Sequence, residues 1–482
     1  MSLTPFENVM MPFSRGGTPE PGSSPVISQS QLRLPEGAPP LPAGIARASG
    51  YRTTSIDPAD VDAFLTHLDT VFHVQKPNGS WGASRLLFED HWHFDPARDP
   101  LGVFVAVTDT QDRLIVSSVR VYNRRMHLGS PSSDAHPMGG IGDVATNLDH
   151  RGKGFAKKLM NMGDEYMRSK GYAFGVLHAA PLAAPIYASI GWRNVAMKAR
   201  VMSTSLASLN VSLSTDTTSA TVRTINFESV HDLSVVKALF ALTAPSIPGS
   251  FARADDFYWQ NYVAKNRDPR RVVVRLLFTQ DGKDASALGV GDLVGYAICE
   301  VLVFDLSAVV TAGQQDTEKS PISVQIKELF AGKVSTVDGA GCVSAAVAQS
   351  PKELSVTITE LLHESLKRLL PSSLPDTYPC KLSITSALLP VEVIQAVDLA
   401  WILSHEKVDE PGWMFKVFHP FRVTRVGDGA EVEIANEEDL EMLLGPVGAA
   451  GAAPIGTVFP GCEGIQLGFG ADVFGFFKTD AF

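Results

Sequence analysis

The residues best suited to chemistry in this sequence form a glycine-rich turn that ends at residue 156. The run at 140–146 has the composition of a β-strand, and Arg151-Gly152-Lys153-Gly154-Phe155-Ala156 leads into an amphipathic helix. Glycines allow the backbone to approach a ligand closely, and the free amides at a helix start bind anions. Arg151, Lys153, Lys157 and Lys158 add positive charge. We therefore predict an anion site here, for which a pyrophosphate is the obvious ligand.

Two other phosphate-binding loops can be compared with this turn. A Walker-type loop does not fit because there is no GK[ST] run, and a Rossmann turn does not fit because no GxGxxG follows the first strand. Glycines at a strand-to-helix turn are also often purely structural. The turn by itself therefore indicates an anion site without identifying the ligand.

The strand and the turn resemble the signature of the GNAT superfamily of N-acetyltransferases. That signature is Arg/Gln-x-x-Gly-x-Gly/Ala, and Arg151, Gly154 and Ala156 match it. In the family, amides of the turn hold the pyrophosphate of coenzyme A, and the backbone of the preceding strand pairs with the pantetheine arm. The resemblance implies acetyl-CoA contacts for Val144, Ala145, Thr146, Arg151, Gly152, Lys153, Gly154, Phe155 and Ala156.

A second element of the same family follows further along the chain. GNAT enzymes commonly carry a Tyr-x-x-x-Gly-aromatic element, which Tyr187, Gly191 and Trp192 match. The resemblance places Tyr187 beside the thioester, where a phenol of ordinary pKa about 10 can protonate a departing thiolate whose thiol pKa is about 8.5. Taken alone, the pattern fits a core aromatic residue of an amphipathic helix equally well. The two motifs together favour a catalytic Tyr187.

The resemblance extends to the Eis (enhanced intracellular survival) group, through Leu177-His178-Ala179, the loop to Tyr187 and a two-domain continuation. Members of that group place an active GNAT domain before an inactive GNAT-like domain and a third domain, and they form oligomers. Their terminal carboxylate, on a final aromatic residue, reaches the site as a base. This chain ends in Phe482, so the resemblance implies that Phe482 is a catalytic base. It departs from the group by its leader and by its short segment after about residue 428.

The chemistry that these residues imply is direct acetyl transfer to a primary amine, either on a small molecule or on a lysine side chain. A backbone amide near Val144 would polarise the thioester carbonyl, and Tyr187 would protonate the sulfur. Positioning and polarisation supply most of the rate gain in such a reaction. A longer acyl-CoA or an oxygen acceptor is a variant of this prediction. The alternative from another class is a non-catalytic acyl-CoA-binding regulatory or scaffold protein, which would not need Tyr187.

Composition narrows the compartment and the partners. Of 482 residues, 45% are hydrophobic and 19% charged, as in globular proteins with real cores. The net charge of -11 argues against nucleic acid or an anionic membrane as partner. Four cysteines without paired spacing and no secretory signal favour the cytoplasm. The uncharged run at 442–462 holds three prolines and five glycines, so we predict a loop there and no membrane span.

The order of elements predicts a mixed α/β fold, with a GNAT domain at 49–203. A leader at 1–48 has nine prolines and is predicted to be disordered. Asp57-Pro58 is typical of a helix start, and apolar residues at helical spacing follow. We expect strands at 103–107, 114–122, 140–146, 174–178 and 195–202, and helices from about 154 and at 184–190.

The rest of the chain predicts a second, degenerate GNAT-like domain at 222–427. A Ser/Thr-rich linker at 204–221 precedes this domain, and a Gly-rich C-terminal segment at 428–482 follows it. It lacks the CoA motif, so we expect it to be structural or to form one wall of the substrate cleft. We expect its helices at 229–242, 254–265, 352–370 and 390–401, and its strands at 271–278, 292–305, 322–329, 380–386 and 412–419.

Four further clusters are predicted to have no catalytic role. In Asp90-His91-Trp92-His93, alternate histidines could ligate a metal from one face of a strand, but no third ligand is near in sequence. We therefore predict no metal site, and expect a wall of the substrate site or an ordinary polar surface there. The basic pairs Arg124-Arg125 and Arg270-Arg271 are expected to be solvated, and the aromatic residues at 257–259 are expected in a core.

Overall fold

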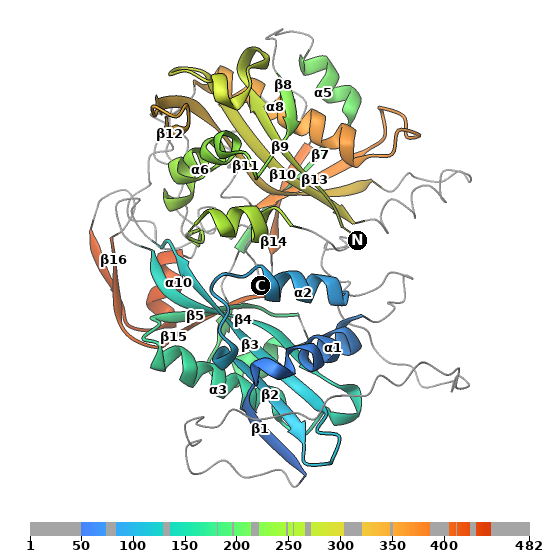
Figure 1. Ribbon diagram of the computed structural model, residues 1–482, viewed down its shortest axis with the longest axis vertical. Coiled ribbons are helices and arrows are strands. Elements are labelled where there is room, and N and C mark those ends of the chain that lie inside the picture. Colours follow the sequence, from blue (N-terminus) through green and yellow to red (C-terminus); the bar gives the residue numbers. More distant parts are fainter. Residues whose placement is uncertain are drawn as a thin grey trace.

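The computed structural model contains two large β-sheets, each flanked by helices, which lie one above the other (Figure 1). The first sheet carries the glycine-rich turn, and the second consists largely of residues that follow it in sequence. The structure describes residues 50–73, 83–128, 135–180, 182–194, 197–213, 221–246, 249–253, 255–265, 271–302, 321–347, 350–385, 404–410, 412–424 and 430–444.

The first sheet has seven strands in the order β1-β2-β3-β4-β5-β15-β6. Neighbouring strands are antiparallel except β4 and β5, which are parallel and are joined through helix α3. The strands are β1 (Tyr51–Ser55), β2 (Val103–Thr108), β3 (Ile115–Met126), β4 (His136–Thr146), β5 (Phe174–His178), β15 (Trp413–Val417) and β6 (Arg193–Asn194). The helices of this domain are α1 (Val61–Phe72), α2 (Arg85–His93), α3 (Phe155–Ser169) and α4 (Ala184–Ala188).

Strand β2 is buried along its whole length, and its alternate side chains enter different hydrophobic clusters. Phe104 and Ala106 pack in one cluster with Leu159 of α3. Val103 packs in another with Phe64 of α1. Because successive side chains of a strand point to opposite faces, α3 and α1 cover opposite faces of the sheet. The first sheet is therefore the middle layer of three.

The second sheet has eight strands: seven lie in the order β14-β7-β13-β11-β10-β9-β8, and the eighth, β12, pairs with β11. The strands are β7 (Met197–Thr204), β8 (Thr221–Thr224), β9 (Arg271–Thr279), β10 (Leu293–Leu302), β11 (Ile322–Val337), β12 (Val343–Val347), β13 (Cys380–Thr385) and β14 (Ser404–Glu410). Its helices include α5 (Leu206–Leu213), α6 (Val230–Thr243) and α8 (Pro351–Leu369). A single large hydrophobic cluster joins this sheet to α6 and α8.

Both sheets follow one plan. Each has an antiparallel run of four strands (β1 to β4, and β8 to β11), then a parallel neighbour and then an antiparallel strand. Each also has a β-bulge two positions after the last parallel pair. In β4 the pair Asp143-Val144 faces Val119, and in β11 the pair Lys327-Glu328 faces Ile298. This shared topology confirms the predicted second GNAT-like domain.

The two domains exchange strands, which the sequence did not predict. Strand β7 directly follows the first domain in sequence but lies between β13 and β14 in the second sheet. Strand β15 comes after the second domain in sequence but lies between β5 and β6 in the first sheet. The predicted boundary at residue 203 and the assignment of 413–417 to the second domain are therefore wrong. The predicted linker at 204–221 also contains a helix, α5.

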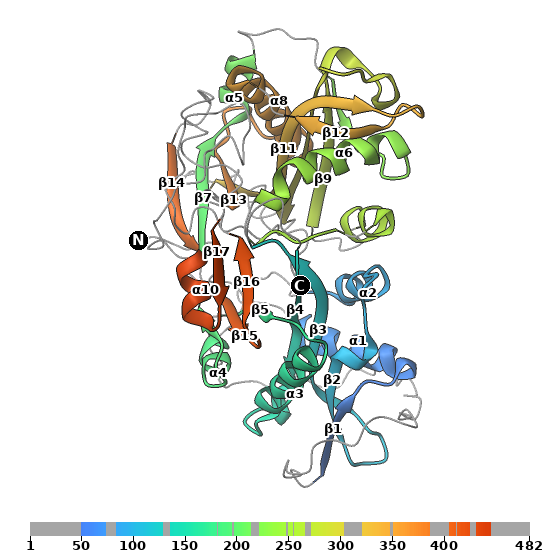
Figure 2. The same cartoon turned by 90° about the vertical axis from the view of Figure 1, so that its left-hand side faces the viewer.

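The chain after β15 continues on the first domain. The hairpin of β16 (Phe421–Thr424) and β17 (Glu431–Ile434) and helix α10 (Glu437–Leu444) lie beside β15 (Figure 2). Val423, Ile434 and Leu440 share a hydrophobic cluster with Phe174 and Phe415. The predicted C-terminal segment thus begins as part of the first domain's core.

Several other expectations can be compared with the described residues. Asp57 accepts a hydrogen bond from the amide of Ala59 at the predicted helix start. His91 and His93, which a metal site on one face of a strand would require, lie on helix α2. The helix expected at 254–265 is a π-helix, η5 (Tyr258–Val263). The leader at 1–48, the helix at 390–401 and Phe482 lie outside the described residues. Within the described ranges, no helix is both long and apolar enough to cross a membrane.

Candidate active site

Strands β4 and β5 separate partway along their length. Their parallel pairing ends at Ile141 and Leu177, and β5 itself ends one residue later. Strand β4 continues to Thr146, paired only with β3 on its other side among the described residues. The backbone of Asp143 to Thr146 is therefore not used by β5. This open edge contains Val144, Ala145 and Thr146, the three residues predicted to meet pantetheine.

The β4 bulge lies within this open edge. Asp143 has a left-handed backbone with φ of 52°, which is uncommon for a residue other than glycine. The hydroxyl of Ser118 donates to the Asp143 carbonyl oxygen at 2.8 Å and fixes the bulge to β3. A bulge re-aims the groups next to it, and here the next residue is Val144. The bulge therefore affects the direction of the Val144 amide, which is the group predicted to polarise the thioester carbonyl.

The predicted anion-binding turn has the backbone that such a site needs. Gly152 and Gly154 both have φ of 77°, in the left-handed region that favours glycine. Gly154 caps helix α3, and no side chain accepts from its first amides. The first turn of α3 contains no acidic residue. The positive end of the helix dipole is therefore available to a phosphate group.

A tyrosine from the opposite sheet edge completes this turn, which the sequence did not suggest. The ammonium of Lys153 donates to the Tyr51 hydroxyl at 3.0 Å, and the same hydroxyl lies 3.0 Å from Nδ1 of His150. The Tyr51 ring also packs edge-on against Phe155, with ring centroids 4.9 Å apart. Arg151 donates from Nε to the Thr146 carbonyl at 3.2 Å. Strand β1 thus holds the turn from the side.

Tyr187 lies on helix α4 in the same hydrophobic cluster as Val144, Phe155 and Leu177. Its residue is 7% exposed, and burial raises the pKa of its phenol to about 12. The hydroxyl forms no hydrogen bond with another described residue. The phenol is therefore protonated over the physiological pH range. Tyr187, the predicted acid, and Val144, whose amide is predicted to polarise the thioester carbonyl, therefore lie in the same hydrophobic cluster.

The loop after Tyr187 is held by a lysine from the exchanged strand β15. The ammonium of Lys416 donates to the Asp164 carboxylate of α3 at 2.6 Å and to the Ile190 carbonyl. Gly191 has φ of 93°, and a side chain there would contact Lys416. A positive group near the C-terminal end of α4 is also favourable to its dipole. Lys416 therefore connects helix α3 to helix α4, which carries Tyr187.

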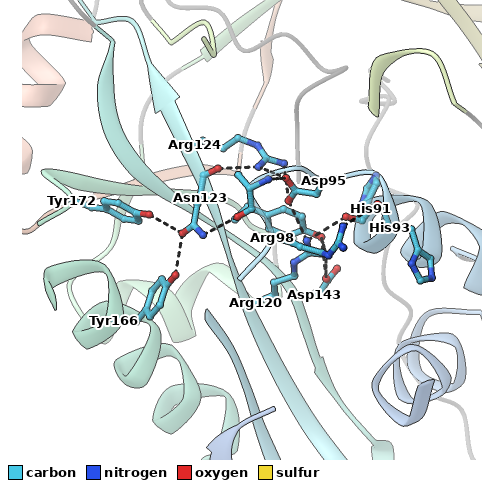
Figure 3. A network of polar contacts seen from close by, with 12 residues as sticks. His91, His93, Asp95, Arg98, Arg120, Asn123, Arg124, Asp143, Tyr166 and Tyr172 are labelled. Atoms are coloured by element: carbon cyan, nitrogen blue, oxygen red, sulfur yellow. Dashed lines mark hydrogen bonds and ion pairs between the residues drawn. The ribbon is translucent and has the colours of Figure 1, made fainter. Parts of the chain in front are cut away.

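A buried polar network lies beside the bulge on the side of the second domain (Figure 3). Asp95 is fully buried and accepts from Arg120 at 3.1 Å and from Arg124 at 3.0 Å. The Tyr122 hydroxyl donates to the Asp143 carboxylate at 2.9 Å, and Arg120 lies 3.7 Å from the same carboxylate. Arg124 is thus buried and paired, so the prediction that it is solvated is wrong.

Burial determines the protonation of this network. Desolvation and, next in size, the positive charge of Arg120 together lower the pKa of His91 to about 3, so its imidazole is neutral. Burial raises the pKa of Asp143, although Arg120 and Tyr122 oppose the change. Among the residues that the structure describes, no three His, Cys, Asp or Glu side chains come together as a metal site requires.

The second domain differs where the first has its turn. The Ser350 side chain accepts from the Glu353 amide, and the Glu353 carboxylate accepts from the Ser350 amide, so α8 caps its own start. On the second bulge, the Glu328 carboxylate is buried against Arg253, with contacts of 2.6 and 3.1 Å. Amides already capped by an acidic residue are poor partners for a pyrophosphate. This is consistent with the lack of the CoA motif.

Comparison with known proteins agrees with this description of the first domain. A family model described as "Acetyltransferase (GNAT) domain" matches residues 52–195. This segment is a GNAT acetyltransferase domain, so the family predicted from Arg151, Gly154 and Ala156 is confirmed. The chain therefore carries an acyltransferase domain. No curated protein matches the chain in sequence.

Solved structures resemble the whole chain more distantly. A GCN5-related N-acetyltransferase from Kribbella flavida has a TM-score of 0.49 and 12% identity, covering 90% of this chain and 98% of its own. One from Anabaena variabilis has a TM-score of 0.45 and 12% identity, with 80% and 83% coverage. Eis1 from Mycobacterium abscessus has a TM-score of 0.41 and 12% identity, also with 80% and 83% coverage. Likenesses at these scores carry no information on activity or substrate.

Proposed function

We propose that this protein is an acetyl-CoA-dependent N-acetyltransferase that acts on a primary amine. One observation carries the proposal: the open edge of β4, the uncapped start of α3 and the buried Tyr187 belong to one domain of the acyltransferase family. The open edge suits a pantetheine arm, and the uncapped amides with Arg151 suit a pyrophosphate. These groups fit acetyl-CoA as the acyl donor.

The reaction is a direct transfer in which the two substrates meet where β4 and β5 separate. The amine nitrogen forms a bond to the thioester carbonyl carbon, and the carbon–sulfur bond then breaks. The Val144 amide stabilises the negative charge that develops on the carbonyl oxygen. The proton lost by the amine goes to a base, and the departing sulfur gains a hydrogen-bonded partner in Tyr187. Holding both substrates in place accounts for much of the rate gain.

The raised pKa of Tyr187 refines its role. A phenol with a pKa of about 12 is a weaker acid than a thiol, whose pKa is about 8.5. Tyr187 therefore acts by donating a hydrogen bond to the developing thiolate and keeps its own proton, and the released thiolate takes its proton from water. The terminal carboxylate of Phe482 remains the predicted base, and this residue lies outside the described residues.

We further propose a small-molecule or lysine-side-chain amine as the acceptor, a cytoplasmic location and assembly into a homo-oligomer. The location is supported by Cys299, Cys342 and Cys380, which are free cysteines. The acidic net charge of -11 suits a cationic acceptor. The assembly rests only on the sequence resemblance to the Eis group.

Turnover of acetyl-CoA by the full chain tests the proposed function. Release of the free thiol is followed with lysine, spermidine, kanamycin and a lysine-containing peptide as acceptors, and the acetylated product is identified by mass. Arg151→Glu, which places a negative charge on the turn, should raise the KM for acetyl-CoA at least tenfold. Tight binding of acetyl-CoA without transfer to any acceptor would instead support the non-catalytic acyl-CoA-binding protein.

A further inference from the structure

The second domain contacts the buried network of the first through aromatic side chains. The Arg124 guanidinium lies 5.2 Å from the ring centroid of Tyr262 and 5.8 Å from that of Tyr258. His91 stacks on Tyr262, with centroids 5.7 Å apart and planes inclined by 22°. A guanidinium over an aromatic ring is attracted most strongly where water is excluded. Both tyrosines are buried, so this contact is a dry one.

These two tyrosines are presented by an unusual helix. Residues Tyr258–Val263 form the π-helix η5, a geometry that is rare and occurs frequently at functional sites. Tyr258 and Tyr262 stack on each other, with centroids 4.9 Å apart and planes inclined by 26°. The two rings therefore form a single aromatic surface, and Arg124 of the first domain lies against it.

A short strap fixes this helix to strand β3. The amide of Ala252 donates to the Arg125 carbonyl at 2.9 Å, and the amide of His127 donates to the Ser250 carbonyl at 2.8 Å. The next residue of the strap, Arg253, is buried and paired with Glu328 on the bulge of the second sheet. Strand β3 therefore contacts the second domain through its backbone as well as through Arg124.

From Arg124 a continuous set of buried contacts reaches the β4 bulge. Arg124 and Arg120 both bind Asp95, and Arg120 lies over the Tyr122 ring at 4.0 Å. Tyr122 in turn donates to the carboxylate of Asp143, the left-handed residue of the bulge. Because these side chains are buried, water does not screen their interactions. A left-handed aspartate persists only where its surroundings hold it.

We infer that the second domain positions the β4 bulge, and with it the Val144 amide, through Tyr262, Arg124 and Asp95. This inference rests on the proposed function and deepens it. The second domain has a self-capped helix start where the first has its turn, and its contribution to catalysis is the aromatic surface of η5. Tyr262 is a positioning residue, because it acts on the Val144 amide through the side chains between them.

Steady-state kinetics of three variants in the full chain test this inference. Tyr262→Leu removes the aromatic face, Tyr262→Phe keeps it, and Arg124→Lys keeps the charge beside Asp95 but loses the flat guanidinium. The matched control is Phe278→Leu, an equivalent truncation in the core of the second domain on β9, away from the network. Rates are measured well below the Tm of each variant, with acetyl-CoA and the best amine of the panel.

Tyr262→Leu and Arg124→Lys should lower kcat roughly tenfold, with the KM for acetyl-CoA within about twofold of wild type. Tyr262→Phe should recover most of the lost kcat, and Phe278→Leu should lower Tm while leaving kcat within about twofold. A kcat for Tyr262→Leu equal to that of Phe278→Leu would overturn the inference, as would a Tyr262→Phe variant as slow as Tyr262→Leu. A wild-type chain that transfers acetyl to no amine overturns the proposed function itself, and this is seen before any variant is compared.

Discussion

Lys416 on the exchanged strand β15 forms an ion pair of 2.6 Å with Asp164 on helix α3, although 252 positions separate them in sequence. The same ammonium binds the Ile190 carbonyl, three residues after Tyr187. The helix that begins at the predicted pyrophosphate site and the helix that carries the predicted acid are therefore joined by a residue from the C-terminal part of the chain. Both ionic side chains are largely buried.

The Lys416–Asp164 pair should contribute strongly to the stability of the first domain. Lys416→Met leaves a buried carboxylate without its partner and should lower the free energy of unfolding by about 3 kcal/mol. Arg193→Ala is the control, because it breaks the exposed pair with Glu438 and should cost less than about 1 kcal/mol. Urea unfolding measures both. Equal losses of unfolding free energy in the two variants would show that the buried Lys416–Asp164 pair stabilises the protein no more than the exposed pair does.

Replacing the phenol of Tyr187 should reduce catalysis without reducing stability. Tyr187→Phe should lower kcat about 30-fold, with a small change in the KM for acetyl-CoA, because the hydrogen bond to sulfur forms as the charge develops. Its Tm should not fall, since the hydroxyl has no partner among the described residues. An unchanged kcat would exclude Tyr187 from the chemistry.

The pKa of Tyr187 makes a related prediction about pH. With a pKa of about 12, the phenol stays protonated as the pH rises through the usual assay range. Any loss of kcat between about pH 8 and pH 10 must therefore come from another group, and Tyr187→Phe should keep the same profile shape at a lower level. A decline of kcat near pH 9 that is seen in the wild type and is absent from Tyr187→Phe would contradict this pKa.

The left-handed glycines of the turn offer a matched comparison. Gly154→Ala forces a side chain into a backbone of positive φ, which should cost about 1 kcal/mol and raise the KM for acetyl-CoA roughly tenfold. Gly171→Ala places the same strain at the other end of α3, where φ is 71°. It should lower Tm similarly and leave KM unchanged. Parallel changes of KM in both variants would refute the assignment of Gly154 to the cofactor site.

One buried histidine, His67, and one partly buried histidine, His91, should make the protein sensitive to acid. Burial lowers the pKa of His67 to about 4 and that of His91 to about 3, whereas both have a pKa near 6.5 when unfolded. The unfolded chain therefore binds protons first as the pH falls. Stability should be complete above about pH 7 and should decline below pH 6.5, by up to about 1.4 kcal/mol per pH unit for each histidine.

Unfolding by urea at pH 7, 6 and 5 measures this decline. His67→Gln removes one titrating group and should reduce the slope of stability against pH by about half. Replacement of the exposed His93 by glutamine is the control and should leave the slope unchanged. A slope that does not change in His67→Gln would mean that His67 is not buried as a neutral ring.

Local features of the first domain could be predicted from the sequence because they depend on neighbouring residues. The turn at Gly152 and Gly154, the helix that starts at Phe155 and the Tyr187-x-x-x-Gly191-Trp192 element each lie within one short segment. Their glycine positions, helical periodicity and strand composition are visible without knowing the fold. The GNAT family and the mixed α/β class followed from them.

His91 marks the limit of that kind of reasoning. Its alternation with His93 led only to a comparison with metal ligands on one face of a strand, but it lies in helix α2, where its ring packs against Tyr122 and Tyr262. Arg124 was expected in water for a similar reason, since a basic pair at a strand end is usually solvated. Its partner Asp95 comes from another element, and its aromatic neighbours come from the other domain. The surroundings of His91 and of Arg124 therefore come from residues that are distant in sequence.

The sequence alone determined the segments that bind and react, and the tertiary structure decided which segments stand next to them. An apolar strand pattern states that a strand is buried but does not state which sheet it joins. Strands β7 and β15 each join the sheet of the other domain, and this pairing brings Lys416 to Asp164. The physical reason is that strand pairing and buried charge pairs form between distant segments, and only the completed fold brings those segments together.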